Sequence, residues 1–385
     1  MRRTLFITIS GLFLTMTMLR GAEGKKQPDY LIYIGTYTGP SSKGIYAYRF
    51  DANIGKATEL GAAGEIANPS FLALDPSRTL LYAVSEISDF QNQHTGAISS
   101  FRINPKTGKL TLLNQVSSAG AGPCFIALDR TGKHLLAANY EAGSVAVFPI
   151  LPEGRLGSAT STIQHSGHGA DAERQQGPHP HWIGLSANNK FAVTADLGLD
   201  RLFVYRFDPS TGSLAKDNAT PFSLPPRSGP RHLTFDSSGK FGYVINEMSS
   251  TLTVFSFDQE RGNLREIQTI STLPGDFAGK NDTAEIALHP NGKFLYGSNR
   301  GHDSIAVFAV NPNNGTLTSI EYVPSGGAKP RSFEIDPSGS YLFVANQISN
   351  KVVIFRIDRN TGRLTPTGEA LDVPSPVCIK FLALK

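Results

Sequence analysis

Cysteine and charge are both scarce in this chain of 385 residues. Only two residues are cysteine, which excludes a disulfide-dense scaffold and a zinc site built from four thiolates. Charged residues make up 18% and hydrophobic residues 40%, and this balance excludes a fully disordered chain. The formal net charge is only +4, and the Lys and Arg residues are scattered along the chain. A nucleic-acid partner is therefore not expected.

Long apolar runs are absent after residue 30, and the one before it is short. Arg2 and Arg3 precede the apolar run Leu5–Leu19, and small residues follow it. This order is typical of a secretory signal peptide, and the run is shorter than the ~20 residues of a membrane-spanning helix. We expect residues 1–24 to be a signal peptide and residues 25–385 to be a periplasmic or secreted domain without stable membrane insertion. An uncleaved membrane anchor is the alternative.

One sequence unit recurs six times along the chain. Each copy has an apolar segment, a polar turn such as Asp-Pro-Ser-Gly, and a second apolar segment. The turn residues that anchor the copies are Asp75, Asp129, Ser186, Asp236, His289 and Asp336. Their spacings of 54, 57, 50, 53 and 47 residues match the period of a propeller blade and not that of a helical solenoid.

Each copy predicts four strands, because an alternating third segment and a fourth segment after a Thr-Gly turn follow the first two. Residues 30–62 match only strands two to four of this unit, and residues 375–384 match only its first strand. The sequence therefore predicts an all-β, seven-bladed β-propeller of four-stranded blades, with the last blade closed by both termini. The alternative is an open sandwich or two smaller barrels, which six aligned copies and two complementary halves disfavour.

Equivalent positions of repeated blades lie on a ring around one axis, so a polar residue that differs from its counterparts is a candidate for function. Two such positions, at the start of the first strand and the end of the second, should meet at one mouth of the channel. The charged and histidine residues found there are His181, Arg231, His232, Glu247, Glu285, Arg300 and Arg331. This group exceeds what packing needs and predicts a substrate cleft. A paired network that fills a narrow tunnel is the alternative.

The segment 164–182 is a long insertion without strand periodicity, and it contains four histidines. We expect it to be a loop over the same face. His179 and His181 are separated by one proline in an extended chain, so they should point in opposite directions and make a poor chelating pair. We therefore expect no metal, and hydrogen-bonding or acid–base work by one of these histidines.

Several short motifs resemble the lactonase family of seven-bladed propellers over roughly residues 30–385. They are Tyr33-Ile-Gly-Thr-Tyr-Thr, Asn139-Tyr-Glu-Ala-Gly-Ser-Val, Glu173-Arg-Gln-Gln-Gly-Pro-His-Pro-His, Gly229-Pro-Arg-His, Asn246-Glu and Asn299-Arg-Gly-His-Asp. Bacterial propeller-type 6-phosphogluconolactonases belong to this family, and fungal carboxy-muconate cyclases are relatives. The resemblance implies a catalytic group made of His181 (or His179), Arg231, Glu247 and Arg300.

The resemblance implies hydrolysis of a sugar lactone by water, without a cofactor. Glu247 or His181 would take the proton from water, and two arginines would stabilise the oxyanion or grip an anionic group of the substrate. The expected substrate-binding residues are Tyr140, His179, His232, Glu285, Arg331 and Gln347. We expect a small-molecule lactone or sugar acid as the partner, and a monomer or weak dimer.

Two other functions stay open at this point. One is a non-catalytic, extracytoplasmic propeller that binds a ligand or a protein, because one fold hosts many functions. The other is a cycloisomerase that acts on a muconate-like acid with the same Arg and His residues. The family's sugar-phosphate lactone is a cytosolic metabolite, whereas this chain carries an export signal, so a different lactone is a further alternative.

Overall fold

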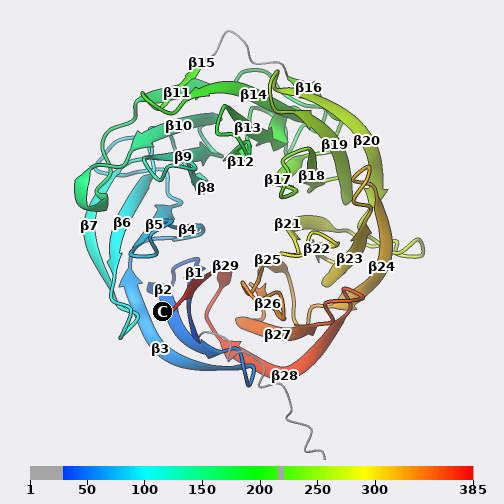
Figure 1. Ribbon diagram of the computed structural model, residues 1–385. Coiled ribbons are helices and arrows are strands. Elements are labelled where there is room, and N and C mark those ends of the chain that lie inside the picture. The colour runs from blue at the N-terminus through cyan, green and yellow to red at the C-terminus, as the bar shows by residue number, and fades with distance from the viewer. Residues whose placement is uncertain (1–28, 216–220, 385) are drawn as a thin grey trace, which may run out of the picture.

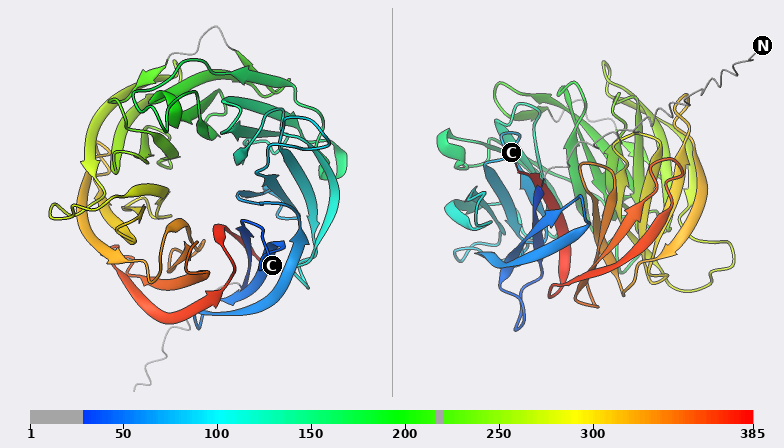
Figure 2. Two further views of the ribbon diagram at one scale, coloured as in Figure 1. Left: turned by 180° about the vertical axis from the view of Figure 1, so that it is seen from behind. Right: turned by 60° about the horizontal axis from the view of Figure 1, so that its bottom comes forward.

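The computed structural model describes residues 29–215 and 221–384. The signal peptide predicted over residues 1–24 lies outside the described residues. Seven antiparallel sheets stand around one axis like the blades of a wheel (Figure 1). The same closed ring is seen from behind in Figure 2. Within the described part, the only helical elements are the short 3-10 turns η1 (Pro152–Gly154) and η2 (Leu197–Leu199). The predicted all-β propeller is confirmed.

Each blade begins with its innermost strand and ends at the rim of the disc. The first three complete blades are β4 (Leu72–Leu74), β5 (Leu80–Ser85), β6 (Ala97–Ile103) and β7 (Leu110–Ser117); β8 (Pro123–Leu128), β9 (His134–Asn139), β10 (Ser144–Pro149) and β11 (Ser161–Gln164); and β12 (Pro180–Leu185), β13 (Phe191–Asp196), β14 (Arg201–Asp208) with the short outer pieces β15 (Ser213–Ala215) and β16 (Phe222–Ser223).

The next three blades follow the same order. They are β17 (Pro230–Phe235), β18 (Phe241–Asn246), β19 (Thr251–Asp258) and β20 (Asn263–Ser271); β21 (Asp282–Leu288), β22 (Phe294–Arg300), β23 (Ser304–Val310) and β24 (Leu317–Pro324); and β25 (Pro330–Ile335), β26 (Tyr341–Asn346), β27 (Lys351–Ile357) and β28 (Leu364–Asp372).

The seventh blade joins the two ends of the described chain, as predicted. Its strands are β29 (Pro376–Ala383), β1 (Asp29–Thr36), β2 (Gly44–Asp51) and β3 (Lys56–Glu65), in that order from the axis. The inner strand β29 pairs with β1 from Tyr30↔Ala383 to Thr36↔Pro376. The red end of the ribbon therefore lies beside the blue end in Figure 1. This pairing closes the ring and leaves no open edge between the first and last blades.

The recurring polar turn is an Asx turn that links the first two strands of a blade. In the β4–β5 turn, the carboxylate of Asp75 accepts backbone N–H bonds from Ser77 at 3.0 Å, Thr79 at 2.8 Å and Leu80 at 2.7 Å. The carboxylates of Asp129 and Asp336 do the same at their turns. The side chain replaces water for three donors that the tight turn would otherwise leave unpaired.

The core lies between the blades, where the faces of neighbouring sheets meet. The second strand of each blade is buried along most of its length. The largest fully buried side chains of these strands include Tyr33, Tyr82, Tyr243 and Tyr296. Each fully buried side chain of this size contributes about 1.5–3 kcal/mol through removal of apolar surface from water. Rigid packing of this kind fixes the inner strands, which hold the candidate site.

Candidate active site

A β-bulge at the start of the innermost strands turns side chains toward the axis. In β12 the pairing with β13 passes from Pro180↔Asp196 to Trp182↔Ala195, which leaves His181 as the extra residue. The same irregularity leaves out Arg231 in β17 and Arg331 in β25. A bulge adds one residue to a strand and redirects its side chain, and bulges are frequent beside active sites. Three predicted site residues therefore owe their direction to one recurring backbone feature.

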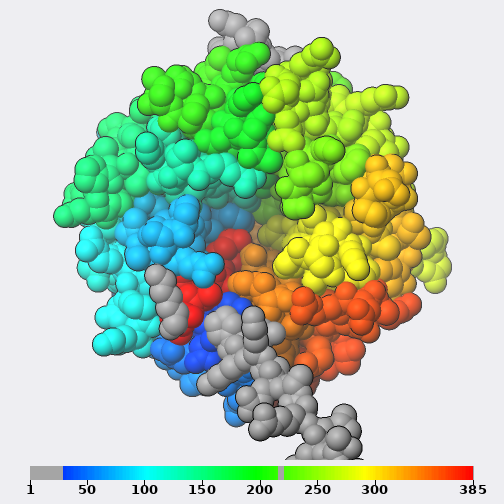
Figure 3. Space-filling model, viewed as in Figure 1, coloured from blue at the N-terminus to red at the C-terminus, as the bar shows by residue number. Residues whose placement is uncertain are grey.

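The bulged residues meet the ends of the second strands around a cavity of about 240 Å³. Glu247 follows β18 and Arg300 ends β22, so each lies beside the start of an inner strand of its blade. Figure 3 shows the disc from the opposite face, at which β29 ends, and that face is hollowed near its centre. The residues that line the cavity are Glu86, Cys124, Tyr140, Arg174, His181, Glu247, Asp282, Arg300 and Arg331.

Glu247 is the electrostatic centre of this cavity. Its Oε1 accepts a hydrogen bond from Nη2 of Arg174 at 2.5 Å, and its Oε2 lies 2.8 Å from Nη2 of Arg300. Nε of Arg231 lies 3.0 Å from the same Oε2, although its N–H is not aligned for a hydrogen bond. Arg231 and Arg300 are also held by backbone carbonyls of Ala284 and Thr283. One carboxylate therefore gathers three guanidinium groups from different parts of the chain.

The charges around Glu247 decide its protonation state. Burial alone would raise the pKa of this carboxyl, but Arg300, Arg231 and Arg174 outweigh burial and lower the pKa to about 2. Burial and the neighbouring Arg331 and Arg300 lower the pKa of Arg231 to about 10, so it also stays charged at neutral pH. Glu247 is thus an ionised partner of arginines and has little capacity to take up a proton near pH 7.

His181 is the histidine that lines this cavity. Its side chain is buried, and its Nδ1 makes no hydrogen bond within the described residues. Its ring lies 5.5 Å from the ring of Tyr140 and 5.1 Å from that of His232. Burial and then the positive charge of Arg231 lower its pKa well below 6.5, so the imidazole is neutral near pH 7. The ring is therefore unprotonated near pH 7, although burial and the nearby arginines weaken it as a base.

His232 and Glu285 lie beneath this cavity and do not line it. Together with Arg231 they border a narrower void of about 10 Å³. Nδ1 of His232 lies 2.8 Å from Oε1 of Glu285, and its Nε2 lies 3.3 Å from Nη1 of Arg231. Burial lowers the pKa of His232 to about 4 despite the adjacent carboxylate. These two predicted binding residues therefore support Arg231 from below.

Arg331 belongs to a separate cluster on the other side of the cavity. Its Nη2 donates to the Tyr37 hydroxyl at 2.9 Å, and its guanidinium lies 5.3 Å from the centre of the Tyr37 ring. The Tyr37 hydroxyl in turn donates to both carboxylate oxygens of Glu86, at 3.0 and 3.1 Å. Arg331 is also one of the residues that line the cavity.

Two further predicted binding residues, His179 and Gln347, also lie outside the lining of the cavity. His179 is half-buried, and its ring stacks on Tyr140 at 4.5 Å while its Nδ1 lies 2.9 Å from the Tyr140 carbonyl oxygen. Gln347 follows β26 and is also half-buried. Its backbone N–H donates to the Lys329 carbonyl at 3.0 Å. The structure thus gathers His181, Glu247 and Arg300 in the cavity, with Arg231 at the void below it. His179 packs on the lining residue Tyr140, and Gln347 is not among the lining residues.

Sequence reasoning missed four residues that line the cavity or contact a lining residue: Arg174, Glu86, Asp282 and Tyr37. Arg174 lies in the insertion before β12, which has no counterpart in the other blades, so no ring position identified it. Glu86 occupies the position equivalent to Glu247, and this signal was available in the repeat. Tyr37 lies in the half-blade at the N-terminal end, where the repeat lacks its first strand. Arg174 and Tyr37 both stand inside motifs that carry the family resemblance, and this was the available signal for them.

The other histidines of the insertion have ordinary structural places. His165 is buried, with Nδ1 2.5 Å from Oδ2 of Asp196 and Nε2 2.8 Å from the Tyr205 hydroxyl, whereas His168 is exposed. Among residues 29–215 and 221–384, no group of three or more His, Cys, Asp or Glu side chains is placed to hold a metal ion. In the same part of the chain, Cys124 and Cys378 are free and buried, and no helix is long and apolar enough to cross a membrane.

Comparisons with known proteins agree on one family. Residues 31–381 match the family model described as lactonase, 7-bladed beta-propeller. The chain is 37% identical over 353 residues to the 6-phosphogluconolactonase of Bacillus subtilis (strain 168), which covers 92% of this chain and 98% of that protein. It is 35% identical over 312 residues to the 6-phosphogluconolactonase of Formosa agariphila, which covers 79% of this chain and 86% of the relative.

A solved structure gives the same result. The periplasmic gluconolactonase of Pseudomonas aeruginosa superimposes with a TM-score of 0.86 at 34% identity, over 93% of this chain and 100% of that one. The likeness therefore extends over the whole described propeller, and it includes relatives named for a phosphorylated and for an unphosphorylated lactone.

Proposed function

The chain belongs to the family of lactonases with a seven-bladed β-propeller, and we propose that it hydrolyses a sugar lactone in the cavity at the axis. The observation that carries this proposal is that His181, whose Nδ1 has no hydrogen-bond partner among the described residues, lines one cavity together with arginines. An ester carbonyl needs both a group that accepts a proton from water and a cation that stabilises the oxyanion.

His181 is the proposed general base. A water molecule attacks the lactone carbonyl carbon while the imidazole takes one of its protons, and the carbonyl oxygen becomes an oxyanion. The tetrahedral intermediate then collapses and breaks the ring C–O bond. The leaving alkoxide takes the proton back from the imidazolium, and the product is the open hydroxy acid. Protons and charges balance without a cofactor.

Arg300 and Arg331 are the proposed electrophilic groups. Both guanidinium groups border the cavity, and both are oriented by backbone or side-chain partners behind them. Preorganised cations at an oxyanion lower the barrier because they need no reorganisation during the reaction. Arg231 lies one layer deeper and acts on the substrate through the charge that it adds to the cluster.

Glu247 has a positioning role in this proposal. Its pKa of about 2 makes it a poor base at neutral pH, and both of its oxygens are engaged by arginines. Of the two bases that the sequence left open, the geometry therefore supports His181. The carboxylates of Glu86 and Asp282 and the hydroxyl of Tyr140 are the proposed partners of the sugar hydroxyls.

We also propose that the protein works outside the cytoplasm. Support comes from the sequence of residues 1–24 and from the likeness to a gluconolactonase that is named as periplasmic. An unphosphorylated sugar lactone is the substrate that fits this location, whereas the Bacillus subtilis relative is named for a phosphorylated one.

A panel of lactones tests this function. Hydrolysis of glucono-δ-lactone, its 6-phosphate and related lactones would be followed with a pH indicator against the spontaneous rate. The change His181→Gln should lower kcat by about 10²–10⁴, because it removes the base. The exposed His168, in the same insertion, supplies the control His168→Gln, which should keep wild-type turnover.

Two results would contradict the proposal. Turnover of no lactone above the spontaneous rate would indicate a propeller that binds without catalysis. Turnover within twofold of wild type for His181→Gln would eliminate His181 as the base and leave the family function intact.

A further inference from the structure

A second cavity lies at the opposite end of the axis, where the innermost strands finish. Its volume is about 470 Å³, and its lining includes Leu74, Leu128 and Ile335, which end β4, β8 and β25. Phe71 borders both this cavity and the narrow void beneath the candidate active site. The Phe71 and Phe125 rings lie 4.1 Å apart and separate the two ends of the channel.

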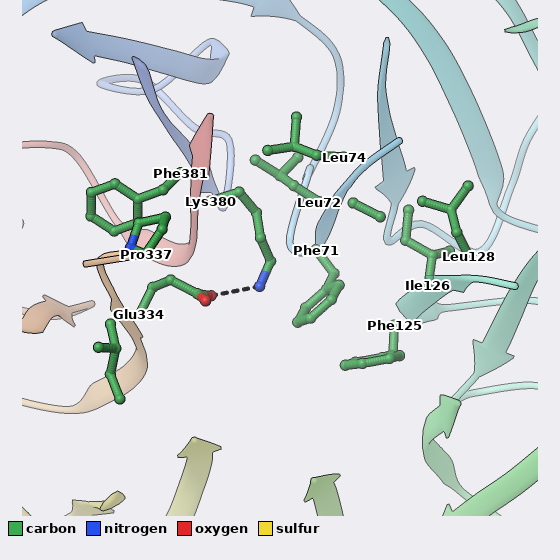
Figure 4. A pocket seen from close by; sticks show the side chains of 12 residues that line it. Phe71, Leu72, Leu74, Phe125, Ile126, Leu128, Glu334, Pro337, Lys380 and Phe381 are labelled. Carbon is green, nitrogen blue, oxygen red and sulfur yellow. Dashed lines mark hydrogen bonds and ion pairs between the residues drawn. The ribbon is translucent and has the colours of Figure 1, made fainter. Parts of the chain in front are cut away.

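The inner wall of this cavity carries one ion pair among apolar residues (Figure 4). Nζ of Lys380 donates to Oε2 of Glu334 at 2.6 Å and lies 5.2 Å from the centre of the Phe71 ring. Both side chains are accessible, with 26% of Lys380 and 32% of Glu334 exposed. Within the described residues, neither group makes another side-chain hydrogen bond. Donors of the ammonium and one carboxylate oxygen therefore stay available to a ligand.

The strand registers show that this pair is an exception on its ring. The equivalent inner-strand residues lie opposite Tyr33, Tyr82, Leu136, Val193, Tyr243, Tyr296 and Phe343 in the second strands. In five blades that residue is small: Ala73, Ala127, Gly184, Thr234 and Ala287. Only the last two blades place long charged side chains there, as Glu334 and Lys380. Small residues keep the cavity open, and the pair polarises one side of it.

We propose that this cavity binds the zwitterion of an α-amino acid with a large apolar side chain. The carboxylate of the ligand would meet the ammonium of Lys380, and its ammonium would meet the carboxylate of Glu334. Its side chain would pack on Phe71, Phe125 and the leucines beyond them, which face Lys380 across the cavity in Figure 4. The volume lies within the usual range of small-molecule sites, which are mostly apolar with a few placed polar groups.

The balance of charge selects a zwitterion over a simple acid or amine. An aryl carboxylate would be attracted by Lys380 but repelled by Glu334. An aryl amine would be attracted by Glu334 but repelled by Lys380. Glu285, the next carboxylate toward the axis, is already bonded to His232 and Ser332. A ligand with both charges about as far apart as those of the Lys380–Glu334 pair satisfies both partners at once.

Calorimetry on the full chain with three ligands of one shape tests the proposal. Phenylalanine should bind saturably, and 3-phenylpropionate and phenethylamine, which each lack one charge, should bind about tenfold or more weakly. The change Glu334→Gln should weaken the binding of phenylalanine by a similar factor and strengthen the binding of 3-phenylpropionate. The change Lys380→Gln should weaken the binding of phenylalanine and strengthen the binding of phenethylamine. If the ion pair only held two blades together, the two variants would not gain affinity for opposite ligands.

Two results would overturn the proposal. One is the absence of phenylalanine and leucine binding to the wild-type chain at millimolar concentration. The other is an equal loss of affinity for all three ligands in both variants, with the temperature of thermal unfolding unchanged. Lactone turnover reports separately on the other end of the axis, so failure here leaves the proposed hydrolysis untouched. The change Phe125→Ala keeps both charges but removes part of the apolar wall, and it should weaken the binding of phenylalanine as well.

Discussion

The two ends of the axis are built from the same seven inner strands, yet they differ in backbone and in chemistry. At the end where the strands begin, bulges turn His181, Arg231 and Arg331 toward the axis, and the cavity is lined by charges. At the end where the strands finish, the register is regular and the wall is apolar except for Lys380 and Glu334. The bulges at one end and the regular register at the other thus separate a charged cavity from a largely apolar one.

The difference shows how a repeat protein acquires a site without losing its fold. A regular strand alternates its side chains, so only every second residue can face the axis. The bulge breaks this rule at one end, and Arg231 and His232 both border the channel although they are adjacent in sequence. The turns and second strands, which carry the packing, are unaffected by the change.

The largest effect should follow from Glu247→Gln. This change leaves the buried Arg231 and two further arginines without their shared carboxylate, and breaking a buried ion pair costs about 3–5 kcal/mol of folding free energy. We expect lactone turnover to fall by about 10² or more, because the arginines repel one another and move. Thermal unfolding and kinetics of the purified variant measure both effects.

An exposed glutamate gives the matched control. Glu369 lies in β28 at the rim, and Glu369→Gln should leave both the unfolding temperature and turnover at wild-type values. Wild-type activity in Glu247→Gln would show that the three arginines keep their places without it, and would break the proposed difference between the two ends.

A smaller effect should follow from Arg174→Gln, which alters the entrance of the cavity. Arg174 is partly exposed, with 39% of its side chain accessible, and its contact with Glu247 comes from outside the cluster. We expect KM to rise about tenfold with little change in kcat, because the residue attracts and orients the substrate. Arg227→Gln, at a more exposed arginine, is the control. A fall in kcat at constant KM would instead place Arg174 at the reacting atoms.

Much of this picture was predictable from the sequence, because the repeat is itself a coordinate system. The turn residues from Asp75 to Asp336 predicted the blades, and the complementary ends predicted the closing pair of β29 and β1. The ring positions also predicted that His181, Glu247 and Arg300 would share one cavity. Each of these depends on spacing, which sequence records directly.

The remainder depends on features that spacing does not record. Arg174 sits in an insertion that only this blade has, so no counterpart revealed it. The bulges are shifts in the pairing register between strands, which spacing does not show. Because of these shifts, His232 and Glu285 lie beneath the cavity and not in its wall. Gln347 shares a ring position with Glu247 but does not line the cavity, and spacing alone could not distinguish the two.

The pH dependence of stability should distinguish the wild type from Glu247→Gln. The folded pKa of Glu247, about 2, lies below the ordinary value of 4.5, so its ionisation stabilises the folded state above pH 4.5. This contribution is lost as the pH falls from 4.5 toward 2. We expect the gap in unfolding temperature between the two proteins to be constant near pH 7 and to narrow below pH 4.5. A gap that widens in acid would contradict the charged state assigned to Glu247.

The smallest effect is expected at the other end of the axis. Glu334→Gln breaks an ion pair whose members are about one quarter to one third exposed, and such pairs contribute about 0–1 kcal/mol. Lactone turnover should stay within twofold of wild type, because Phe71 and Phe125 separate this end from the candidate active site. A tenfold loss of turnover, measured in the same indicator assay, would show that the two ends are coupled.

The location of the product within the ring tests the central claim most directly. A crystal structure of the protein soaked with gluconate, the open acid of glucono-δ-lactone, should show its carboxylate between His181 and the guanidinium of Arg300. Gluconate bound at the Lys380 end, or outside the channel, in a protein that hydrolyses the lactone would contradict the assignment of the chemistry to the bulged end.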